Sequence, residues 1–248
     1  MTLGGLRGRW KDRLRRVYNG YDLDVLLRYL AARRLAQGCA TILDVGSGSA
    51  KCGLLSARGS VFATDIVLPG FRMKEDIPFV QADGVRLPFP DQAFDCTTCL
   101  DVFEHLPVAS RQTLAAEVIR TAKKKAIFGM PIGERARQQD QFLQGLHIRR
   151  FGYPFGPLVK HLANPVAQVE EIEQAVRQTA GRRLLSLHSF PSVNIELQTA
   201  YFHLAFHRSR LVNALYFCMG LLFRALPLLT YLSDRGDCYR VLFVVELS

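Results

Sequence analysis

Residues 42–50 read Ile-Leu-Asp-Val-Gly-Ser-Gly-Ser-Ala, an apolar run that ends in an acid and then turns through two glycines. Glycine lets the backbone approach a ligand where any Cβ would collide, and a helix that begins near Ser49 would offer free N–H groups. The segment therefore predicts a nucleoside-binding turn, with Gly46, Ser47 and Gly48 as contacts.

The neighbouring residues indicate which kind of nucleoside fits. The dinucleotide fingerprint has Gly or Ala at its sixth position, where the helix packs on the strand and a pyrophosphate is bound. Here that position is Lys51. Asp44 lies two residues before the first glycine, close to where a pyrophosphate would sit, but it could pair with an ammonium group directly or through water. The pattern favours a cationic amino-acid nucleoside.

Acidic residues also end the next predicted strands. Asp65 lies 21 positions after Asp44, the spacing at which a carboxylate at the tip of a second strand binds ribose hydroxyls. Asp83 ends a third strand beside Gly84 and could reach an adenine edge. The predicted cofactor contacts are Asp44, Gly46, Ser47, Gly48, Asp65, Ile66, Asp83, Gly84 and Leu100.

With these residues in view, the chain resembles the class I S-adenosylmethionine-dependent methyltransferases, within them the group that includes the ubiquinone and menaquinone methyltransferases. The resemblance runs in order through DVGSGSA (44–50), ATD (63–65), ADG (82–84), LPFPDQAFD (87–95) and DVFEHLP (101–107). Ala50 stands where the family usually has a third glycine. The resemblance covers roughly residues 38–131. It implies S-adenosylmethionine as cofactor and leaves the substrate open.

The whole chain of 248 residues alternates strand-like with helical segments. Such alternation predicts an α/β fold: a Rossmann-like, seven-stranded, mostly parallel sheet with helices on both faces and its ligand at the carboxyl ends of the strands. The resemblance adds that the last strand runs antiparallel between the fifth and sixth. Helices are predicted at 23–36, 50–57, 108–121 and 168–179, and strands at 40–45, 61–65, 78–82, 94–100, 124–130, 183–190 and 239–247.

Two histidines are the candidate catalytic bases. A sulfonium is an activated methyl donor, so the protein must align the acceptor and remove a proton if the acceptor is a hydroxyl. His105 follows the fourth strand, where Glu104 beside it is a further candidate, and His147 is expected in the loop between the fifth strand and the next helix. His105 could instead anchor the following helix, and His147 could equally be structural.

Metal binding is a second question for the same segment. Some quinone O-methyltransferases of this group use an acidic residue, two spacers and Glu-His for a divalent metal, and Asp101, Glu104 and His105 fit that pattern. The Glu-His pair also occurs in members without a metal, so we assign none. Cys96 and Cys99 should point to opposite faces of a strand and cannot readily share one zinc ion.

The cysteines and the N-terminus indicate the compartment. All six cysteines are expected to be buried or half-buried reduced thiols: Cys39, Cys52, Cys96, Cys99, Cys218 and Cys238. The first twenty residues are basic and lack the apolar core of a cleavable signal. These features predict a cytoplasmic protein.

Much of the excess positive charge lies near the N-terminus of the chain. Lys and Arg number 32 against 22 Asp and Glu, a net charge of +10. Residues 1–21 form a predicted basic amphipathic segment around Trp10, ahead of a methyltransferase domain at 22–248. A basic amphipathic helix with a tryptophan is typical of a membrane surface. Nucleic acid is an unlikely partner, because the chain has no recognised nucleic-acid module.

An apolar insertion, at about 192–236, lies between the sixth and seventh strands and includes Leu211–Leu232. A straight helix of that length could cross a ~30 Å hydrocarbon core. One crossing would leave the last strand on the wrong side of the membrane, and Arg224 and Pro227 also oppose a continuous span. We expect a broken, in-plane or re-entrant helix pair; the alternative is a buried lid or a homodimer interface.

These features together predict a methyltransferase on the cytoplasmic membrane face that methylates an apolar or lipid-linked acceptor at oxygen. The alternatives are a soluble small-molecule or glycan methyltransferase, and a catalytically silent binding subunit with this fold. Retention of Asp44, Gly46, Gly48, Asp65 and Asp83 argues against a silent protein.

Overall fold

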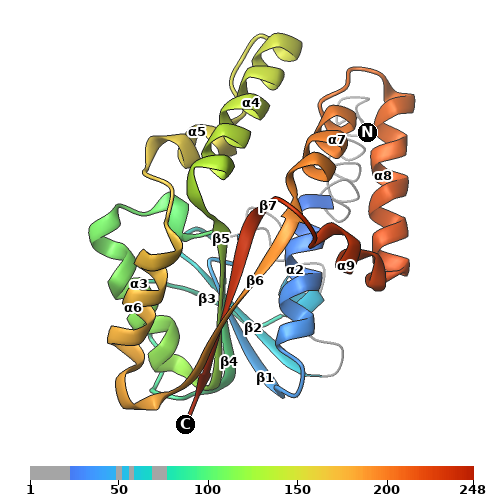
Figure 1. The fold of residues 1–248 in the computed structure, drawn as a ribbon. Helices are drawn as coiled ribbons and strands as arrows, with labels where there is room; N and C mark the ends of the chain where they lie inside the picture. Colours follow the sequence, from blue (N-terminus) through green and yellow to red (C-terminus); the bar gives the residue numbers. More distant parts are fainter. Residues whose placement is uncertain (1–22, 49–51, 56–58, 69–76) are drawn as a thin grey trace, which may run out of the picture.

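The computed structural model describes residues 23–48, 52–55, 59–68 and 77–248. Within them one sheet of seven strands has the order β3-β2-β1-β4-β5-β7-β6 (Figure 1). The strands are β1 (Thr41–Val45), β2 (Ser60–Asp65), β3 (Phe79–Gln81), β4 (Phe94–Leu100), β5 (Ala122–Pro131), β6 (Leu184–Asn194) and β7 (Cys238–Leu247). The strands from β1 to β5 pair in parallel, and β7 is antiparallel to both β5 and β6. The predicted fold class and the position of the last strand are confirmed.

The two faces of the sheet form separate cores because alternate residues of a strand point to opposite sides. Leu43 of β1 packs against α3 (Val108–Thr121) and α6 (Val169–Ala180), which Figure 1 shows on one side. Ile42 packs on the other side, against α2 (Leu23–Leu35) and a short 3₁₀ helix, η1 (Cys52–Leu55).

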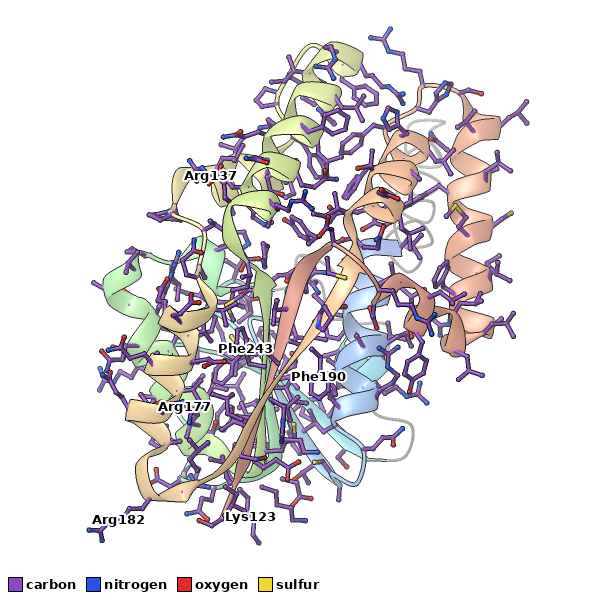
Figure 2. The ribbon with its side chains drawn as sticks, in the orientation of Figure 1. Lys123, Arg137, Arg177, Arg182, Phe190 and Phe243 are labelled. Atoms are coloured by element: carbon purple, nitrogen blue, oxygen red, sulfur yellow. The ribbon has the colours of Figure 1, made fainter. Side chains whose placement is uncertain are left out.

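Side chains divide in the same way. Phe243 of β7 is fully buried in the sheet, whereas Arg177 and Arg182 project from the outer surface (Figure 2). Cys96 and Cys99 of β4 lie in the two different cores, as predicted from their spacing. All six cysteines are free, but Cys218 is exposed, so the expectation that all would be at least half-buried is wrong for it.

Helix prediction was incomplete after β5. Two helices, α4 (Gly133–Phe151) and α5 (Gly156–Ala163), occupy a region in which no helix was predicted. The helix predicted at 50–57 is η1 in its described part. A further 3₁₀ turn, η3 (Gly181–Arg183), follows α6.

The insertion between β6 and β7 is helical and broken. It contains α7 (Ile195–Ala205), α8 (Arg210–Ala225), the 3₁₀ turn η4 (Pro227–Leu229) and α9 (Thr230–Ser233). Pro227 cannot donate a backbone hydrogen bond, and the helix ends before it, as the sequence predicted. Within the described ranges, no helix is long and apolar enough to span a membrane. The predicted basic segment at 1–21 lies outside the described residues.

A buried ion-pair cluster joins the end of β4 to β7 and to α2. Asp101, just after β4, accepts hydrogen bonds from Arg240 Nε at 2.7 Å and Nη2 at 2.5 Å, and from Arg28 Nη1 of α2 at 2.5 Å. Burial alone would raise the pKa of Asp101, but the two guanidinium groups outweigh it and hold the pKa well below its usual range. The backbone N–H of Asp101 also donates to Gly129 O at 2.7 Å. One side chain thus fixes β4, β7 and α2 together.

We predict that Asp101→Asn lowers the free energy of unfolding by about 3–5 kcal/mol, because it leaves buried arginines without their carboxylate. Asparagine tolerates the positive φ of 54° at this position, so the backbone should not add strain. Urea denaturation monitored by circular dichroism measures the change. Asp91→Asn is the control, since that carboxylate is 73% exposed. An equal, small effect of both substitutions would contradict the role of Asp101.

Candidate active site

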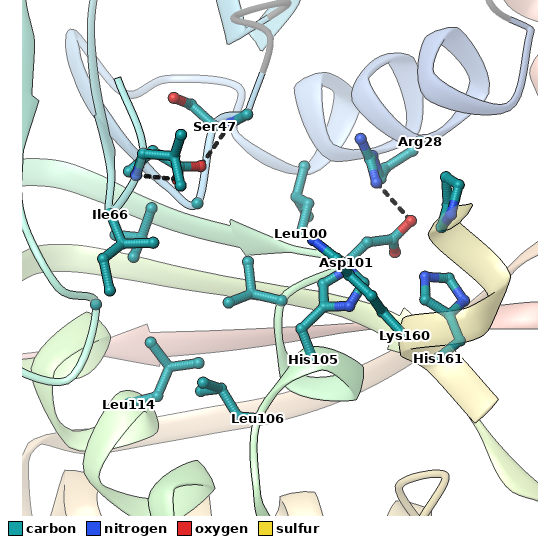
Figure 3. Close-up of a pocket in the computed structure, with 18 of the residues that line it drawn as sticks. Arg28, Ser47, Ile66, Leu100, Asp101, His105, Leu106, Leu114, Lys160 and His161 are labelled. Atoms are coloured by element: carbon teal, nitrogen blue, oxygen red, sulfur yellow. Dashed lines mark hydrogen bonds and ion pairs between the residues drawn. The ribbon is translucent and has the colours of Figure 1, made fainter. Parts of the chain in front are cut away.

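A cavity of about 840 Å³ opens at the carboxyl ends of the parallel strands. Figure 3 shows Ser47 and Ile66 on one side and His105, Lys160 and His161 on the other, with Leu100 between them. The volume is in the range of small-molecule sites. Of the predicted site residues, the cavity brings together Gly46, Ser47, Gly48, Asp65, Ile66, Asp83, Gly84, Leu100 and His105.

The glycine turn after β1 has a conformation that favours glycine. Gly46 and Gly48 have φ values of 73° and 55°, in the left-handed region. A Cβ on Gly46 would lie 2.3 Å from Cγ2 of Val102, so the turn packs directly on the segment after β4. The N–H groups of Gly46 and Ser47 both donate to Thr64 O, at 2.8 and 3.1 Å. These contacts hold the turn against the end of β2.

Asp65, at the end of β2, organises the rim of the cavity. Its carboxylate accepts hydrogen bonds from Gly48 N at 2.8 Å and Val67 N at 2.9 Å. Each carboxylate oxygen can accept more than one hydrogen bond, so capacity remains for a ligand hydroxyl. Ser47 Oγ is buried at the cavity and has no hydrogen-bond partner in the part of the chain described. A polar ligand would satisfy this hydroxyl.

Asp83 and Gly84 form the adjacent rim. The Asp83 side chain is exposed and accepts from Val85 N at 3.1 Å. A Cβ on Gly84 would lie 3.0 Å from Leu114 Cδ1 and 3.3 Å from Val45 Cγ1, so the loop packs tightly there.

Asp44 does not line the cavity. It is 1% exposed, beneath the glycine turn, and accepts hydrogen bonds from Tyr29 Oη and Thr98 Oγ1, both at 2.7 Å. Burial raises its pKa to about 6, although the hydrogen bonds from Thr98 and Tyr29 oppose that shift. A contact of Asp44 with a cofactor ammonium group stays a prediction.

The other side of the cavity carries a polar cluster. Glu104 and His105 belong to the 3₁₀ turn η2 (Phe103–His105), and His161 comes from α5. The rings of His105 and His161 lie 4.9 Å apart, centroid to centroid, and His161 Nε2 is 3.8 Å from Glu104 Oε1. His161 Nδ1 is 3.3 Å from Asp140 Oδ2, and Asp140 also accepts from Tyr239 Oη at 2.6 Å.

These groups have shifted pKa values. Burial, and next the charge of Asp101, raise the pKa of Glu104 to about 8. Burial lowers the pKa of His105 to about 4, and the neighbouring His161 acts in the same direction. Burial also lowers the pKa of His161, but the hydrogen bond with Asp140 and the charge of Glu104 outweigh it, so the net shift is upward.

The structure does not bring His147 to the cavity. It lies on α4 rather than in the expected loop, is 6% exposed, and its Nδ1 is 2.9 Å from Tyr153 O. Its ring packs among four aromatic residues, with centroids 4.7–5.2 Å away: Phe151, Tyr153, Phe155 and Phe206. We therefore correct its expected position and do not retain it as a base. The alternative metal set of Asp101, Glu104 and His105, to which no metal was assigned, is not assembled: Asp101 is held by two arginines and does not join the Glu104, His105 and His161 cluster.

Several cavity residues were missed by sequence reasoning. They come from α2, α5 and α7 and their flanking loops: Arg28, Phe155, Lys160, His161, Asn164 and Phe202. A helix-start signal was available for α5, since Pro157 stands in its first turn. That signal predicts a helix. It does not predict that the helix lies over the cavity, because its position depends on tertiary packing.

The arrangement of the sheet, with its ligand cavity at the strand tips, defines a class I methyltransferase fold. A S-adenosylmethionine-dependent methyltransferase from Thermotoga maritima has a similar structure, with 13% identity, 97% of each chain covered and a TM-score of 0.57. One from Archaeoglobus fulgidus is 14% identical, covers 97% of this chain and 94% of its own, and has a TM-score of 0.50. At these identities the likeness establishes the fold.

Residues 43–130 match the sequence model of the Methyltransferase domain family. No curated protein matches the chain by sequence. The fold and the family match over residues 43–130 together support an S-adenosylmethionine-dependent methyltransferase, and they imply S-adenosylmethionine as its cofactor. The site fits that cofactor: Ser47 offers an unsatisfied hydroxyl, Asp65 a carboxylate, and the glycine turn a close backbone approach.

We predict that Gly46→Ala destabilises the protein and weakens cofactor binding, because the new methyl group would overlap Val102. Gly38→Ala is the matched control: Gly38 also has a positive φ, of 84°, but a Cβ there meets nothing within 4 Å. The double substitution Gly46→Ala with Val102→Ala should recover most of the difference between the two variants. Urea denaturation and calorimetry measure both effects. Failure of Val102→Ala to restore stability would show that the overlap is not the cause.

We predict that Asp65→Ala weakens S-adenosylmethionine binding by one to two decades, because a charge-assisted hydrogen bond is worth about 1.5–3 kcal/mol. Isothermal titration calorimetry with S-adenosylmethionine and S-adenosylhomocysteine measures the affinity. Asp65→Asn, which keeps the shape but removes the charge, should fall between the wild type and the alanine variant. Unchanged affinity in Asp65→Ala would remove Asp65 from the set of cofactor contacts.

Proposed function

We propose that this methyltransferase works at a membrane surface and methylates a hydroxyl group on an apolar or lipid-linked acceptor. The proposal rests above all on one observation, an exposed apolar face on α8. The sequence resemblance to the ubiquinone and menaquinone methyltransferase group supports an acceptor of this kind.

The exposed face of α8 follows helical spacing. Seven exposed apolar positions recur every three or four residues and define the α8 stripe: Leu211, Ala214, Leu215, Cys218, Leu221, Leu222 and Ala225. Leu211 is 82% exposed and Leu215 is 58% exposed. Exposed apolar surface continues after α8 at Leu226, Leu228, Tyr231 and Leu232. A large exposed apolar patch on a protein surface usually marks a contact with another protein or with a membrane.

The opposite face of α8 holds it to the body of the protein. Tyr216 and Phe223 are buried against α2 and α7, and the ring of Tyr216 lies 6.3 Å from that of Tyr201. Figure 1 shows α8 at the outside of the molecule, beyond α2. Phe202, the neighbour of Tyr201 on α7, lines the cavity. The stripe is therefore on the outer face of α8, whereas α7, which packs against the inner face of α8, contributes Phe202 to the cavity.

The cavity suits an acceptor with an apolar part and a hydroxyl. Phe155, Pro157 and Phe202 offer apolar surface, whereas His105 and His161 form a polar wall. The sulfonium of S-adenosylmethionine supplies the activated methyl group. The protein then positions the acceptor oxygen and accepts its proton. We assign both roles to the wall of the cavity that contains His105.

Two measurements test the acceptor class. Mass spectrometry of lipid extracts from a deletion strain should reveal species lighter by one methyl group than in the parent. The purified protein should transfer a tritiated methyl group from S-adenosylmethionine into that extract, and at a limiting cofactor concentration Asp65→Ala should transfer far less. Transfer confined to water-soluble small molecules or glycans would replace the proposal with the soluble alternative. No transfer to any fraction would favour a silent binding subunit.

Membrane attachment gives a separate prediction. Changing Leu211, Leu215 and Leu222 together to Gln should reduce cosedimentation with phosphatidylglycerol-phosphatidylcholine vesicles several-fold, because each leucine loses favourable burial in lipid. These exposed positions should leave the melting temperature nearly unchanged. Phe223 is avoided, since it is only 9% exposed and packs in the core.

The matched control is Leu185→Gln, at a leucine of β6 that is 66% exposed and distant from α8 in the sequence. It should bind vesicles like the wild type. If the wild type ignores vesicles and the triple variant instead shifts a dimer to a monomer in analytical ultracentrifugation, the α8 stripe is a subunit interface and the membrane proposal is wrong.

A further inference from the structure

We propose that Glu104, His105 and His161 form a binding site for one divalent transition-metal cation, best matched by Zn²⁺, in the wall of the cavity. Their potential ligand atoms all lie within 4.8 Å of one another. Donor atoms that share a zinc ion lie within about 4 Å of each other, so only a small contraction of the cluster is needed. Two imidazoles and one carboxylate are a ligand set that suits Zn²⁺.

The carboxylate of Glu104 points to a cation because it is buried without a hydrogen-bond partner among the described residues. Glu104 is 3% exposed, and neither of its carboxylate oxygens has a hydrogen-bond partner among the described residues. Burying an ionised carboxylate costs several kcal/mol, so the group either takes up a proton, in line with the raised pKa of Glu104, or is held ionised by a bound cation. Protonated His161 would supply charge, but at 3.8 Å its Nε2 is too far from Oε1 to donate a hydrogen bond.

A second and independent observation concerns the orientation of His161. Its Nδ1 faces Asp140, and Asp140 is itself fixed by the hydroxyl of Tyr239. Histidines that bind metals commonly use one ring nitrogen for the metal and donate the other to a carboxylate, which fixes the tautomer and the ring. This arrangement leaves His161 Nε2 on the side of Glu104 and His105.

The two elements that carry the ligands are also held together. Asn164, which follows α5, donates from Nδ2 to the backbone oxygen of Glu104 at 3.1 Å. This contact fixes α5 against η2 without using the Glu104 carboxylate. Three protein ligands would leave one zinc position open. His105 and His161 both line the cavity, so that position would be accessible from it.

A cation in this wall would have a chemical role that rests on the proposed function. A bound hydroxyl loses its proton more readily beside Zn²⁺, because the cation stabilises the oxyanion. An acceptor hydroxyl could then be deprotonated near neutral pH without a strong base. The metal site itself is defined by the side chains alone and does not depend on the identity of the acceptor.

The test is metal binding by the full chain, freed of metal with a chelator and assayed without cofactor or acceptor. Titration with Co²⁺ should give visible absorption bands that saturate at one ion per chain, and Zn²⁺ should displace them. Glu104→Gln and His161→Ala should each weaken Zn²⁺ binding at least 100-fold in calorimetry. Asp140→Asn should weaken it by 10- to 100-fold, as expected for a residue that orients a ligand.

Two further variants keep the test decisive. His105 is the most accessible of the three ligands, so His105→Ala removes a ligand with the least risk to folding, and it should also weaken binding strongly. His188→Ala removes an exposed histidine outside the cluster and should bind like the wild type. The proposal is overturned if the wild type binds neither Co²⁺ nor Zn²⁺ at micromolar concentration, or if the Glu104, His105 and His161 variants all retain wild-type affinity. Neither result depends on the acceptor, so failure here is distinct from failure of the proposed function.

Discussion

The buried carboxylate of Asp101 is the constraint on which the arrangement of the cavity depends. Arg240 of β7 and Arg28 of α2 both bind it, so the end of β4 is tied to a distant strand and to the helix that covers the sheet. Glu104, His105 and the residue that packs on the glycine turn, Val102, follow directly in the chain. Any movement of Asp101 would therefore displace both the histidine-containing wall of the cavity and Val102, against which the glycine turn packs.

Much of the sheet, and the residues that line the glycine-turn side of the cavity, could be predicted from sequence because both depend on local signals. Buried strands appear as short apolar runs, and the acids that end them identify the edge where a ligand is found. The two glycines of the turn predict a left-handed backbone conformation, and Gly46 and Gly48 both have positive φ. The division of Cys96 and Cys99 between two cores follows from the alternation of side chains along one strand.

The opposite side of the cavity could not be predicted because its residues meet only through tertiary packing. His161 lies far along the chain from Glu104, and no local pattern relates the two. His147 was misplaced for a related reason: the polar sequence of α4 gave no clear apolar periodicity. The aromatic partners of His147 come from α4, from the loop after it and from Phe206, which directly follows α7. In the insertion, Pro227 predicted the break, but which face of α8 would be buried required knowledge of α2 and α7.

The position of β7 has a consequence for folding. This strand pairs with β5 and β6 on its two sides, yet more than 100 residues separate it from β5 in the chain. Until residues 238–247 are synthesised, β5 lacks a partner on one edge and β6 lacks its only strand partner, and pairing over such a distance is slow because loop closure costs entropy. Since β7 also carries Arg240, the ion-pair cluster at the cavity can form only after the sheet closes. Nascent chains halted before β7 should be aggregation-prone through these two edges.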